Sequence, residues 1–386
     1  MKEHPTPERV LRLLFWETTI KCNLACAHCR RIEANEAIVT DLSTEQAMDL
    51  IDQLAEVGSA QPMMPVLVFS GGEPLCRSDL FDLTAHARKA GLTLALASNG
   101  TMIDSDVAEK IRASGIARVS ISLDGATAEV HNKLRRMQGS FEAALEGIAR
   151  LREKSVPFQI NITLTKHNSH QLKQTYDLAK SLGAVALHIF MLVPVGCGQT
   201  LAETDMLSPE QYEQMLIEIC SLDGLSELQV KVTCGPHYER VIRQQGLYET
   251  RRQAPTAPGG GHIGRKAAGH PAGLIPGRPA HAYGASKGCL AGLGVLFVGH
   301  QGNVFPCGYL PVNCGNILQT KLADIWQNNK DLARMRDADS LEGKCGLCGY
   351  RELCGGCRAR AYAATTNYMA EEPLCAYIPP QATTES

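Results

Sequence analysis

The stretch Lys21-Cys-Asn-Leu-Ala-Cys-Ala-His-Cys-Arg30 contains a cysteine triad, Cys22, Cys26 and Cys29, in a C-x3-C-x2-C spacing. It begins soon after an apolar run at 13–19 that predicts a buried β-strand. Three thiolates on one loop can hold three corners of a cubic iron-sulfur cluster and leave the fourth iron open, whereas four thiolates make a closed site. An open iron is a place for chemistry, so we predict a redox enzyme with a bound cosubstrate.

A zinc site is the alternative interpretation of this loop. Zinc sites usually combine paired C-x2-C ligands with a further Cys or His, and His28 would supply such a residue. Because His28 is the immediate neighbour of Cys29, ligation of one ion by both is awkward. We therefore favour the cluster and keep His28 as a cofactor-binding candidate.

The overall composition is that of an ordinary globular protein. The 386 residues carry a formal net charge of -2 and are 44% hydrophobic, which gives no general attraction for nucleic acid. Because an apolar signal segment and long apolar runs are both missing, we expect a cytoplasmic protein with no membrane partner. The 15 cysteines favour metal or cluster ligation over disulfides, since cytosolic thiols stay reduced.

Short apolar runs alternate with helical patterns from Leu11 to about Pro194. A capping box from Ser43 to Gln46 predicts a helix that ends at Gly58. The predicted strands lie at 13–19, 66–70, 92–97, 117–123, 158–164 and 185–192. Six strand-helix repeats predict an α/β fold with a parallel sheet, either open and doubly wound or an incomplete barrel. In both, functional groups gather at the carboxyl ends of the strands.

Composition also suggests how the chain is divided. Residues 254–285 are dense in Gly, Pro, Ala and His without periodicity, which predicts a long loop or linker. Residues 286–378 are rich in cysteine and poor in long apolar runs, as in a small domain organised by metal. We predict a tail at 1–10, a strand-helix domain at 11–210, a bridging segment at 211–285, a cysteine-rich domain at 286–378 and a tail at 379–386.

A second motif, Ser70-Gly-Gly-Glu-Pro74, follows the second predicted strand. Alone it has the composition of a turn, but together with the cysteine triad it resembles the radical S-adenosylmethionine (AdoMet) enzymes. The resemblance implies an incomplete (β/α)6 barrel and a 4Fe-4S cluster that binds AdoMet at its open iron and cleaves it to a 5'-deoxyadenosyl radical. It also implies that Gly71 and Gly72 let the backbone approach the methionine part of AdoMet, and that Glu73 accepts from its ammonium group.

Three further positions match cosubstrate contacts in this superfamily. Asn99 follows the third predicted strand, Ser122 lies within Ser120-Ile-Ser-Leu-Asp-Gly125 at the end of the fourth, and Arg135 comes after it. Hydroxyl and amide groups suit ribose hydroxyls, and a guanidinium suits the methionine carboxylate. Caps and turns are the alternative for Asn99, so we favour Ser122 and Arg135 and keep Asn99 as a further cofactor-binding candidate.

A second group of cysteines has the order Cys289-x12-Gly302-x4-Cys307, then Cys345-x2-Cys348-x5-Cys354-x2-Cys357, and finally Cys375. This order resembles the SPASM extension, which carries auxiliary iron-sulfur clusters. A zinc ribbon is the alternative, because two C-x2-C pairs can bind one ion, but it leaves three cysteines without a role. The family pattern assigns the distal auxiliary cluster to Cys345, Cys348, Cys354 and Cys375, and the proximal auxiliary cluster to Cys289, Cys307 and Cys357. Val295 stands where some relatives have a further cysteine. The proximal cluster would then have either an open iron or Cys314 as its fourth ligand.

The remaining cysteines are interpreted in two ways. We expect core or loop thiols at three of them, because cysteine packs as a small hydrophobe: Cys76, Cys197 and Cys220. Cys234 lies close to His237, on the segment between the two parts of the chain that would carry clusters. This pair is the catalytic candidate, since it would ligate the iron of a tetrapyrrole or supply a proton, although a lone histidine is more often structural.

Over nearly its whole length the chain resembles the anaerobic heme b synthases of the siroheme-dependent route (AhbD). The resemblance is carried by Trp16-Glu-Thr-Thr19, His188-Ile-Phe-Met-Leu-Val-Pro194, Cys234-Gly-Pro-His-Tyr238, Pro306-Cys-Gly-Tyr309, Cys354-Gly-Gly-Cys-Arg-Ala-Arg360 and Met369-Ala-Glu-Glu-Pro-Leu-Cys375. It implies that two propionates of Fe-coproporphyrin III lose CO2 and become vinyl groups. It also implies two auxiliary clusters of the 4Fe-4S type as electron acceptors, and a flavodoxin or ferredoxin as the electron donor.

Alternatives to this substrate stay open, because Arg31 and Ile32 replace the small and acidic residues expected after the triad. Guanidinium groups suit carboxylates, so candidate propionate clamps are Arg30, Arg31, Arg358 and Arg360, with solvated surface arginines as the alternative. The nearest rival function is the removal of a tetrapyrrole side chain, as in heme d1 synthesis (NirJ). Peptide-modifying SPASM maturases are a further rival, whereas the Gly-Gly-Glu-Pro motif argues against a cluster protein without radical chemistry.

Overall fold

The computed structural model describes residues 10–31, 40–225, 227–246 and 288–380. Its ten-stranded sheet has the order β10-β9-β8-β1-β2-β3-β4-β5-β6-β7. The strands are β1 (Leu13–Glu17), β2 (Val66–Ser70), β3 (Thr93–Ser98), β4 (Arg118–Ser122), β5 (Phe158–Leu164), β6 (Ala186–Met191), β7 (Gln229–Thr233), β8 (Val295–Val298), β9 (Asn303–Phe305) and β10 (Gly315–Asn316). Strands β1 to β7 are parallel, β8 joins β1 in parallel, and β9 and β10 are antiparallel additions.

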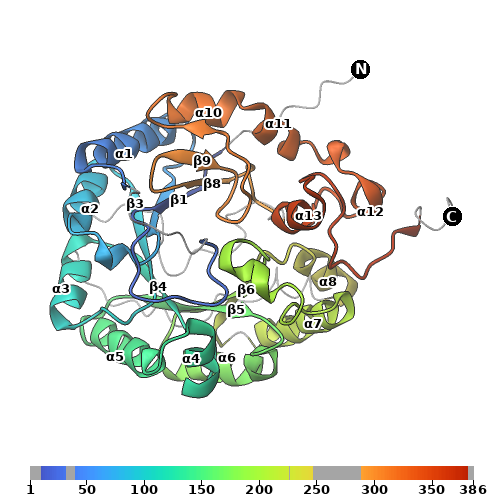
Figure 1. Ribbon diagram of the computed structural model, residues 1–386, viewed down its shortest axis with the longest axis horizontal. Helices are drawn as coiled ribbons and strands as arrows, with labels where there is room; N and C mark the ends of the chain where they lie inside the picture. The colour runs from blue at the N-terminus through green and yellow to red at the C-terminus, as the bar shows by residue number, and fades with distance from the viewer. Residues whose placement is uncertain (1–9, 32–39, 226, 247–287, 381–386) are drawn as a thin grey trace.

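Helices cover the outside of this sheet, which curves into an incomplete barrel (Figure 1). They are α1 (Thr44–Ser59), α2 (Leu80–Lys89), α3 (Ser105–Ser114), α4 (Ala128–Arg135), α5 (Ser140–Glu153), α6 (Leu172–Ser181), α7 (Pro209–Gly224), α8 (Tyr238–Gln244), α10 (Leu322–Asn328), α11 (Lys330–Arg336), α12 (Gly343–Gly346) and α13 (Arg358–Thr365). Short 3-10 turns are η1 (Pro74–Cys76), η2 (Ser169–Gln171), η3 (Gly196–Leu201) and η5 (Ala338–Ser340). Among the described residues, none of the helices has the length and apolar character that a membrane crossing needs.

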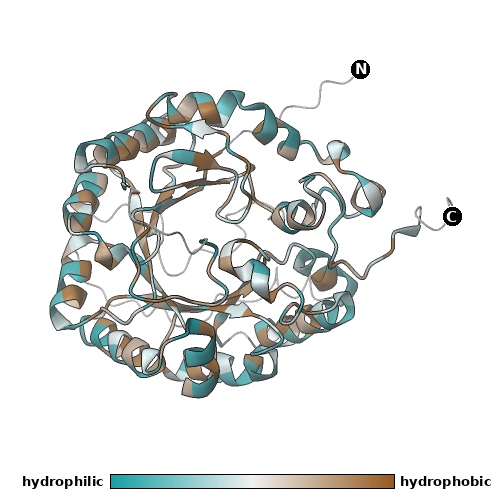
Figure 2. Ribbon diagram, viewed as in Figure 1, coloured by the Kyte–Doolittle hydropathy of each residue, from teal (hydrophilic) through white to brown (hydrophobic). Residues whose placement is uncertain are grey.

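The main core lies between the helices and the sheet. Helix α1 is an example. The predicted capping box of Ser43 and Gln46 is present at its start, and the helix buries Leu50 and Leu54 completely. Each such leucine contributes about 1.5–3 kcal/mol on transfer from water. The strands are largely hydrophobic and the outer helices mix both kinds of residue (Figure 2), which is the pattern of helices that bury one face.

The six strands predicted between Leu11 and Pro194 are confirmed, with small corrections at their ends. The first strand ends at Glu17 rather than at residue 19, because the chain turns there into the cysteine loop. Helix α1 continues one residue beyond the predicted stop at Gly58 and is capped by Ala60. Two strands lie outside the predicted set of six: β7 within the bridging segment and β8 within the cysteine-rich region.

Some sequence predictions concern residues that the structure does not describe. The loop at 254–285 lies wholly outside the described residues, as does most of each predicted tail. The predicted domain boundaries stay predictions. The sheet itself runs through several of the predicted parts, because β8 places Val295 beside Leu13 of β1.

Candidate active site and auxiliary cysteine groups

The loop of the cysteine triad is tied to the barrel at both ends. At its start, Thr19 Oγ1 donates to Asp41 Oδ2 (2.6 Å) and Ile20 N donates to Asp41 Oδ1 (3.1 Å). Farther along, Ala27 N donates to Leu134 O at the end of α4 (2.9 Å). The triad therefore lies at the carboxyl end of β1, the functional end of a parallel barrel.

The Gly-Gly-Glu-Pro segment packs directly on this loop. Gly72 N donates to Thr19 O and Glu73 N donates to Lys21 O, both at 2.8 Å. A Cβ atom on Gly72 would lie 2.2 Å from Lys21 O, and one on Gly71 (φ 148°) would lie 2.6 Å from Thr19 O. Both glycines are thus required for close approach to the chain's own backbone. Their contact with the methionine part of AdoMet stays a prediction.

Glu73 is completely buried among donors from the end of β3. Its Oε1 accepts from Ser98 Oγ (2.9 Å) and from Leu75 N (3.3 Å), and its Oε2 accepts from Asn99 N (2.8 Å). Burial raises the pKa of Glu73 to about 7, although these hydrogen bonds favour the ionised form. A cationic ligand group beside Glu73 would stabilise the carboxylate.

The side chain of Asn99 is bound within the protein. Its Nδ2 donates to Asn23 Oδ1 in the cysteine loop (2.8 Å), and its Oδ1 accepts from Thr101 N and Oγ1. Asn23 Nδ2 in turn donates to Thr101 Oγ1 (2.8 Å). Asn99 therefore positions the cysteine loop. A further contact between Asn99 and a ribose stays a prediction.

Asp124 joins two of the predicted cofactor-binding residues. Its Oδ2 lies 2.7 Å from Arg135 Nη2 and 3.2 Å from His28 Nε2, and its Oδ1 accepts from Thr163 N. Arg135 Nη1 also donates to Cys26 Sγ (3.6 Å). Burial alone would raise the pKa of Asp124, but the charges of Arg135 and His28 lower it, so the carboxylate stays ionised. Arg135 is thereby held as a cation beside a triad thiol.

The sequence does not predict a role for Asp124, although this residue lies two positions after Ser122 in the motif Ser120-Ile-Ser-Leu-Asp-Gly125. Ser122 is the last residue of β4 and pairs with Asn161 of β5. Strand alternation gives the missing signal: Asp124 follows a buried strand end, and a buried carboxylate there needs a partner. That partner, Arg135, lies on the next helix.

The arginines after the triad have partners inside the protein. Arg30 Nη2 lies 2.6 Å from Glu17 Oε1, and its guanidinium stacks 4.2 Å from the centre of the Phe297 ring. His300 Nδ1 approaches the second oxygen of Glu17 (3.0 Å). Arg31 donates to Ile20 O. These contacts help to hold the cysteine loop, and a role of either arginine as a propionate clamp stays a prediction.

Four cysteines of the second group line one pocket, and they are the four assigned to the distal auxiliary cluster: Cys345, Cys348, Cys354 and Cys375. Other residues also line this pocket, whose empty volume is about 370 Å³ with open solvent included. Backbone N–H groups of Tyr350 and Gly356 donate to Cys348 Sγ (3.4 Å) and Cys354 Sγ (3.5 Å). Such donors favour thiolates over thiols, which fits cluster ligation.

His237 lines the same pocket and is buried. Its ring stands edge-on against Tyr212, with the ring centres 5.1 Å apart. In the described part of the chain, neither ring nitrogen has a hydrogen-bond partner. Burial lowers the pKa of His237 to about 3, so the imidazole is neutral. His237 therefore lies at the distal group, whereas Cys234 packs in an apolar cluster with Cys357. A catalytic role of either residue stays a prediction.

The proximal cysteines form a second, separate group. Cys289, Cys307 and Cys357 lie within electrostatic reach of one another, and Cys234 interacts with Cys357 and Cys307. The interaction with Cys234 lowers the pKa of Cys357, against the effect of burial. Cys314 lies apart, with its Sγ near Val312 O (3.6 Å).

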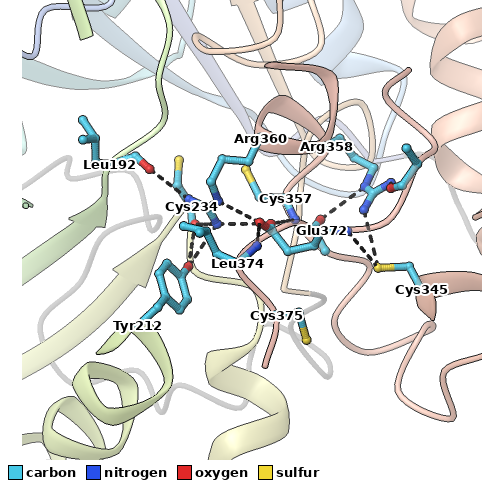
Figure 3. A network of polar contacts seen from close by, with 12 residues as sticks. Leu192, Tyr212, Cys234, Cys345, Cys357, Arg358, Arg360, Glu372, Leu374 and Cys375 are labelled. Atoms are coloured by element: carbon cyan, nitrogen blue, oxygen red, sulfur yellow. Dashed lines mark hydrogen bonds and ion pairs between the residues drawn. The ribbon is translucent and has the colours of Figure 1, made fainter. Parts of the chain in front are cut away.

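A buried ion pair lies between the two auxiliary cysteine groups and contacts residues of both (Figure 3). Arg360 Nε lies 2.9 Å from Glu372 Oε1, and both side chains are fully buried. Glu372 Oε2 accepts from Cys357 N (2.7 Å), and Glu372 N donates to Cys345 Sγ (3.4 Å). Arg360 also donates to backbone carbonyls at Cys234 and Leu192. The predicted propionate clamp at Arg360 is therefore wrong, because its donors are taken.

Arg358 is also committed to the protein. Its Nη1 donates to Tyr368 O and Ala370 O, both at 2.8 Å, and its Nη2 points at Cys345 Sγ (3.9 Å). Among the three cysteines expected to be core or loop thiols, Cys220 is buried in the main core and Cys76 lies 3.7 Å from the Met102 sulfur. Cys197 N donates to Arg31 O at the far end of the cysteine loop.

The donor chemistry fits iron-sulfur clusters at the triad and at the distal group. Across the described residues, no three Cys, His, Asp or Glu side chains surround one point closely enough to bind a single ion. The fit rests instead on thiols that receive backbone N–H or guanidinium donors: Cys22 from Leu24 N, Cys26 from Arg135, and Cys345 from Glu372 N. Hydrogen bonds to the sulfurs are a recognised feature of cluster sites. The ligand assignments themselves stay predictions.

Two known protein families match parts of this chain. "Radical SAM superfamily" matches residues 16–179, and "Iron-sulfur cluster-binding domain" (SPASM) matches residues 289–358. The structure of Streptococcus suis SuiB bound to S-adenosylmethionine superposes with a TM-score of 0.69 over 96% of this chain and 78% of that one. At 14% sequence identity this likeness concerns the fold.

Sequence relatives extend over nearly the whole chain. The AdoMet-dependent heme synthase of Methanosarcina barkeri is 44% identical over 95% of this chain and 97% of that protein. The protein of the same name from Nitratidesulfovibrio vulgaris is 38% identical over 96% of this chain and 94% of that protein. The pre-heme d1 synthase of Dinoroseobacter shibae is 28% identical over 96% of this chain and 89% of that protein.

Proposed function

Because the chain belongs to the radical SAM superfamily, as an enzyme of the AdoMet-dependent heme synthase type, we propose that it makes heme b from Fe-coproporphyrin III. In this reaction two propionate side chains lose their carboxyl groups as CO2 and become vinyl groups. The observation that carries the proposal is the 44% identity to a heme synthase over 95% of the chain.

Atom and electron balance defines what the site must do. A propionate R–CH2–CH2–COO⁻ loses one hydrogen atom, one electron and CO2, and leaves R–CH=CH2. A cluster held by Cys22, Cys26 and Cys29 would supply the one-electron cleavage of AdoMet, whose 5'-deoxyadenosyl radical would take the hydrogen, and clusters held by the auxiliary cysteines would accept the electron. One electron enters and one leaves, so each vinyl group forms with no net redox change in the enzyme.

The residues of the chain bind and orient the cosubstrate. Glu73 presents a carboxyl group whose two oxygens are fixed by Ser98 and Asn99, which suits the ammonium of AdoMet. Asp124 and Arg135 place a fixed cation beside Cys26 and thereby stabilise its thiolate. A flavodoxin or ferredoxin as the electron donor remains a prediction.

The proposal is tested with the reconstituted protein under anaerobic conditions. It is incubated with dithionite, AdoMet and Fe-coproporphyrin III, and the porphyrins and nucleosides are measured by mass spectrometry. We expect successive loss of two carboxyl groups, with one 5'-deoxyadenosine formed for each vinyl group. Formation of 5'-deoxyadenosine without any decarboxylated porphyrin would reject the substrate while keeping the radical chemistry.

Removal of a whole propionate chain is the second candidate, supported by the similarity to a pre-heme d1 synthase. The same mass spectra separate the two reactions. Conversion to a vinyl group keeps two carbons of the side chain on the ring, whereas removal of the chain leaves a ring position without them. The lower identity, 28% against 44%, makes this the weaker candidate.

A further inference from the structure

We propose that Cys234 is the fourth protein ligand of the proximal auxiliary cluster, which makes this group a closed set of four thiolates: Cys234, Cys289, Cys307 and Cys357. The assignment replaces both alternatives that the sequence leaves open, namely an open iron and ligation by Cys314. It also moves Cys234 out of the role of an axial ligand to a tetrapyrrole. Only the resulting function as an electron acceptor rests on the proposed reaction.

Side-chain contacts bring Cys234 into the proximal group. Its thiol interacts electrostatically with Cys357 and Cys307. Cys307 in turn lies within reach of Cys289 and Cys357. Cys234, Cys307 and Cys357 share one apolar cluster with Val193 and Leu310. Four thiols from four separate segments of the chain thus converge in one water-poor space.

The backbone around Cys234 is built to hold this position. Cys234 has a left-handed φ of 57°, a conformation that is strained for a residue with a side chain. Its carbonyl oxygen accepts from Arg360 Nη2 (2.6 Å) and from Tyr212 Oη (3.1 Å). These two bonds fix the peptide and compensate for the strained conformation.

The same ion pair fixes Cys357. Arg360 is paired with Glu372, whose Oε2 accepts from Cys357 N (2.7 Å). One buried pair therefore orients the backbones of Cys234 and Cys357 together, as Figure 3 shows. If Cys234 were only a neighbour of the cluster and not a ligand, the Arg360–Glu372 pair would have no reason to hold both cysteine backbones.

Cys314 does not meet these conditions. It packs in the main core with Leu322 and Ile325, away from the apolar cluster of the proximal group. The charged groups that influence it are Asp331 and Arg336, and its Sγ is directed at Val312 O.

Four thiolates change what the proximal cluster is able to do. A site with an open iron can bind substrate directly, whereas a fully ligated site serves electron transfer. The tetrapyrrole would therefore bind elsewhere, and the proximal group would act as an electron acceptor.

The experiment compares the full-length Cys234→Ala variant with the wild type, after identical anaerobic reconstitution and without porphyrin. Iron and sulfide are counted per chain, and the dithionite-reduced cluster signals are recorded by electron paramagnetic resonance with and without added 2-mercaptoethanol. The triad signal is identified by its response to AdoMet. Cys307→Ala is the positive comparison, Cys314→Ala tests the alternative ligand, and Cys220→Ala is the matched control for loss of a buried cysteine.

For Cys234→Ala we expect the behaviour of Cys307→Ala: either a loss of about four irons per chain or a proximal signal that shifts when the thiol is added. Cys314→Ala and Cys220→Ala should match the wild type. Unchanged iron, sulfide and spectra in Cys234→Ala would overturn the proposal, as would a thiol-sensitive signal in the wild type. If Cys234→Ala does not fold, Cys234→Ser decides, because an oxygen ligand must alter the proximal signal. Since no porphyrin is present, failure here is separate from failure of the proposed reaction.

Discussion

Asp124 shows how one side chain sets the chemistry of its neighbours. It is fully buried, yet two cationic or polar partners from different segments approach the same oxygen: His28 on the cysteine loop and Arg135 on α4. Because Arg135 also reaches Cys26, the charge of Asp124 determines how strongly the guanidinium supports that thiolate. The carboxylate therefore acts on the triad without touching a sulfur itself.

Replacement of Asp124 tests this arrangement. Asp124→Asn keeps the size of the side chain and removes its charge, leaving Arg135 buried without its counterion. Loss of one partner of a buried pair costs about 3–5 kcal/mol. We expect a lower free energy of unfolding by that amount and loss of iron from the triad. The control is Asp339→Asn, which breaks an exposed pair with Arg351 and should change stability by about 1 kcal/mol or less. Equal effects of the two variants would contradict the role of Asp124.

The raised pKa of Glu73 predicts how stability and AdoMet affinity depend on pH. Its pKa is raised from 4.5 to about 7, so the folded chain holds a proton that the unfolded chain has released between those values. Its contribution to stability therefore falls as pH rises through this window. Binding of the AdoMet ammonium needs the carboxylate, and we expect AdoMet affinity to rise between pH 6 and pH 8. Equilibrium binding across this range should show the rise in the wild type and a flat profile in Glu73→Gln. The same slope in both would show that another group titrates.

At the scale of elements, the sequence predicts the barrel strands because each is an apolar run with a clear end. It does not predict β7, where Lys231 and Gln229 are exposed and the apolar signal is weak. It also does not predict that β8 pairs with β1, because this pairing joins Leu13 to Val295 across most of the chain. Local pattern contains no information about such a distant partner.

The contact between the Gly-Gly-Glu-Pro segment and the cysteine loop gives an element-scale prediction. In Gly72→Ala the new Cβ would lie 2.2 Å from Lys21 O, so the loop must move. We expect loss of the triad's iron and of AdoMet-dependent 5'-deoxyadenosine, with the auxiliary clusters retained. Iron analysis and nucleoside chromatography measure both. Gly224→Ala is the control, because a Cβ there meets no atom within 4 Å. Retained triad iron in Gly72→Ala would contradict the packing argument.

At the scale of the whole molecule, Arg360 and Glu372 connect the barrel to the C-terminal cysteines. Arg360 reaches Leu192 after β6 and Cys234 after β7, and Glu372 contacts residues of both auxiliary groups. The cysteine spacings predict the two groups, but not this pair. Arginine and glutamate are ordinary surface residues, and only tertiary packing shows that these two are buried.

Removal of the Glu372 charge should affect the whole C-terminal region. In Glu372→Gln the Arg360 cation stays buried without its partner. We therefore expect the free energy of unfolding to fall by about 3–5 kcal/mol. Iron bound to both auxiliary groups should fall, while the AdoMet-responsive triad signal remains. Denaturant titration and iron analysis provide the measurements. Glu342→Gln, which breaks an exposed pair with Arg334, is the control and should change neither. An effect confined to one auxiliary group would show that Glu372 does not connect them.

The central claim is that the triad at the barrel mouth directs a radical to a tetrapyrrole propionate. Fe-coproporphyrin III deuterated at the β-carbons of its propionates tests this most directly. After anaerobic turnover with AdoMet and dithionite, we predict deuterium in 5'-deoxyadenosine and vinyl groups in the porphyrin product. Unlabelled 5'-deoxyadenosine, formed while the propionates stay intact, would contradict the claim.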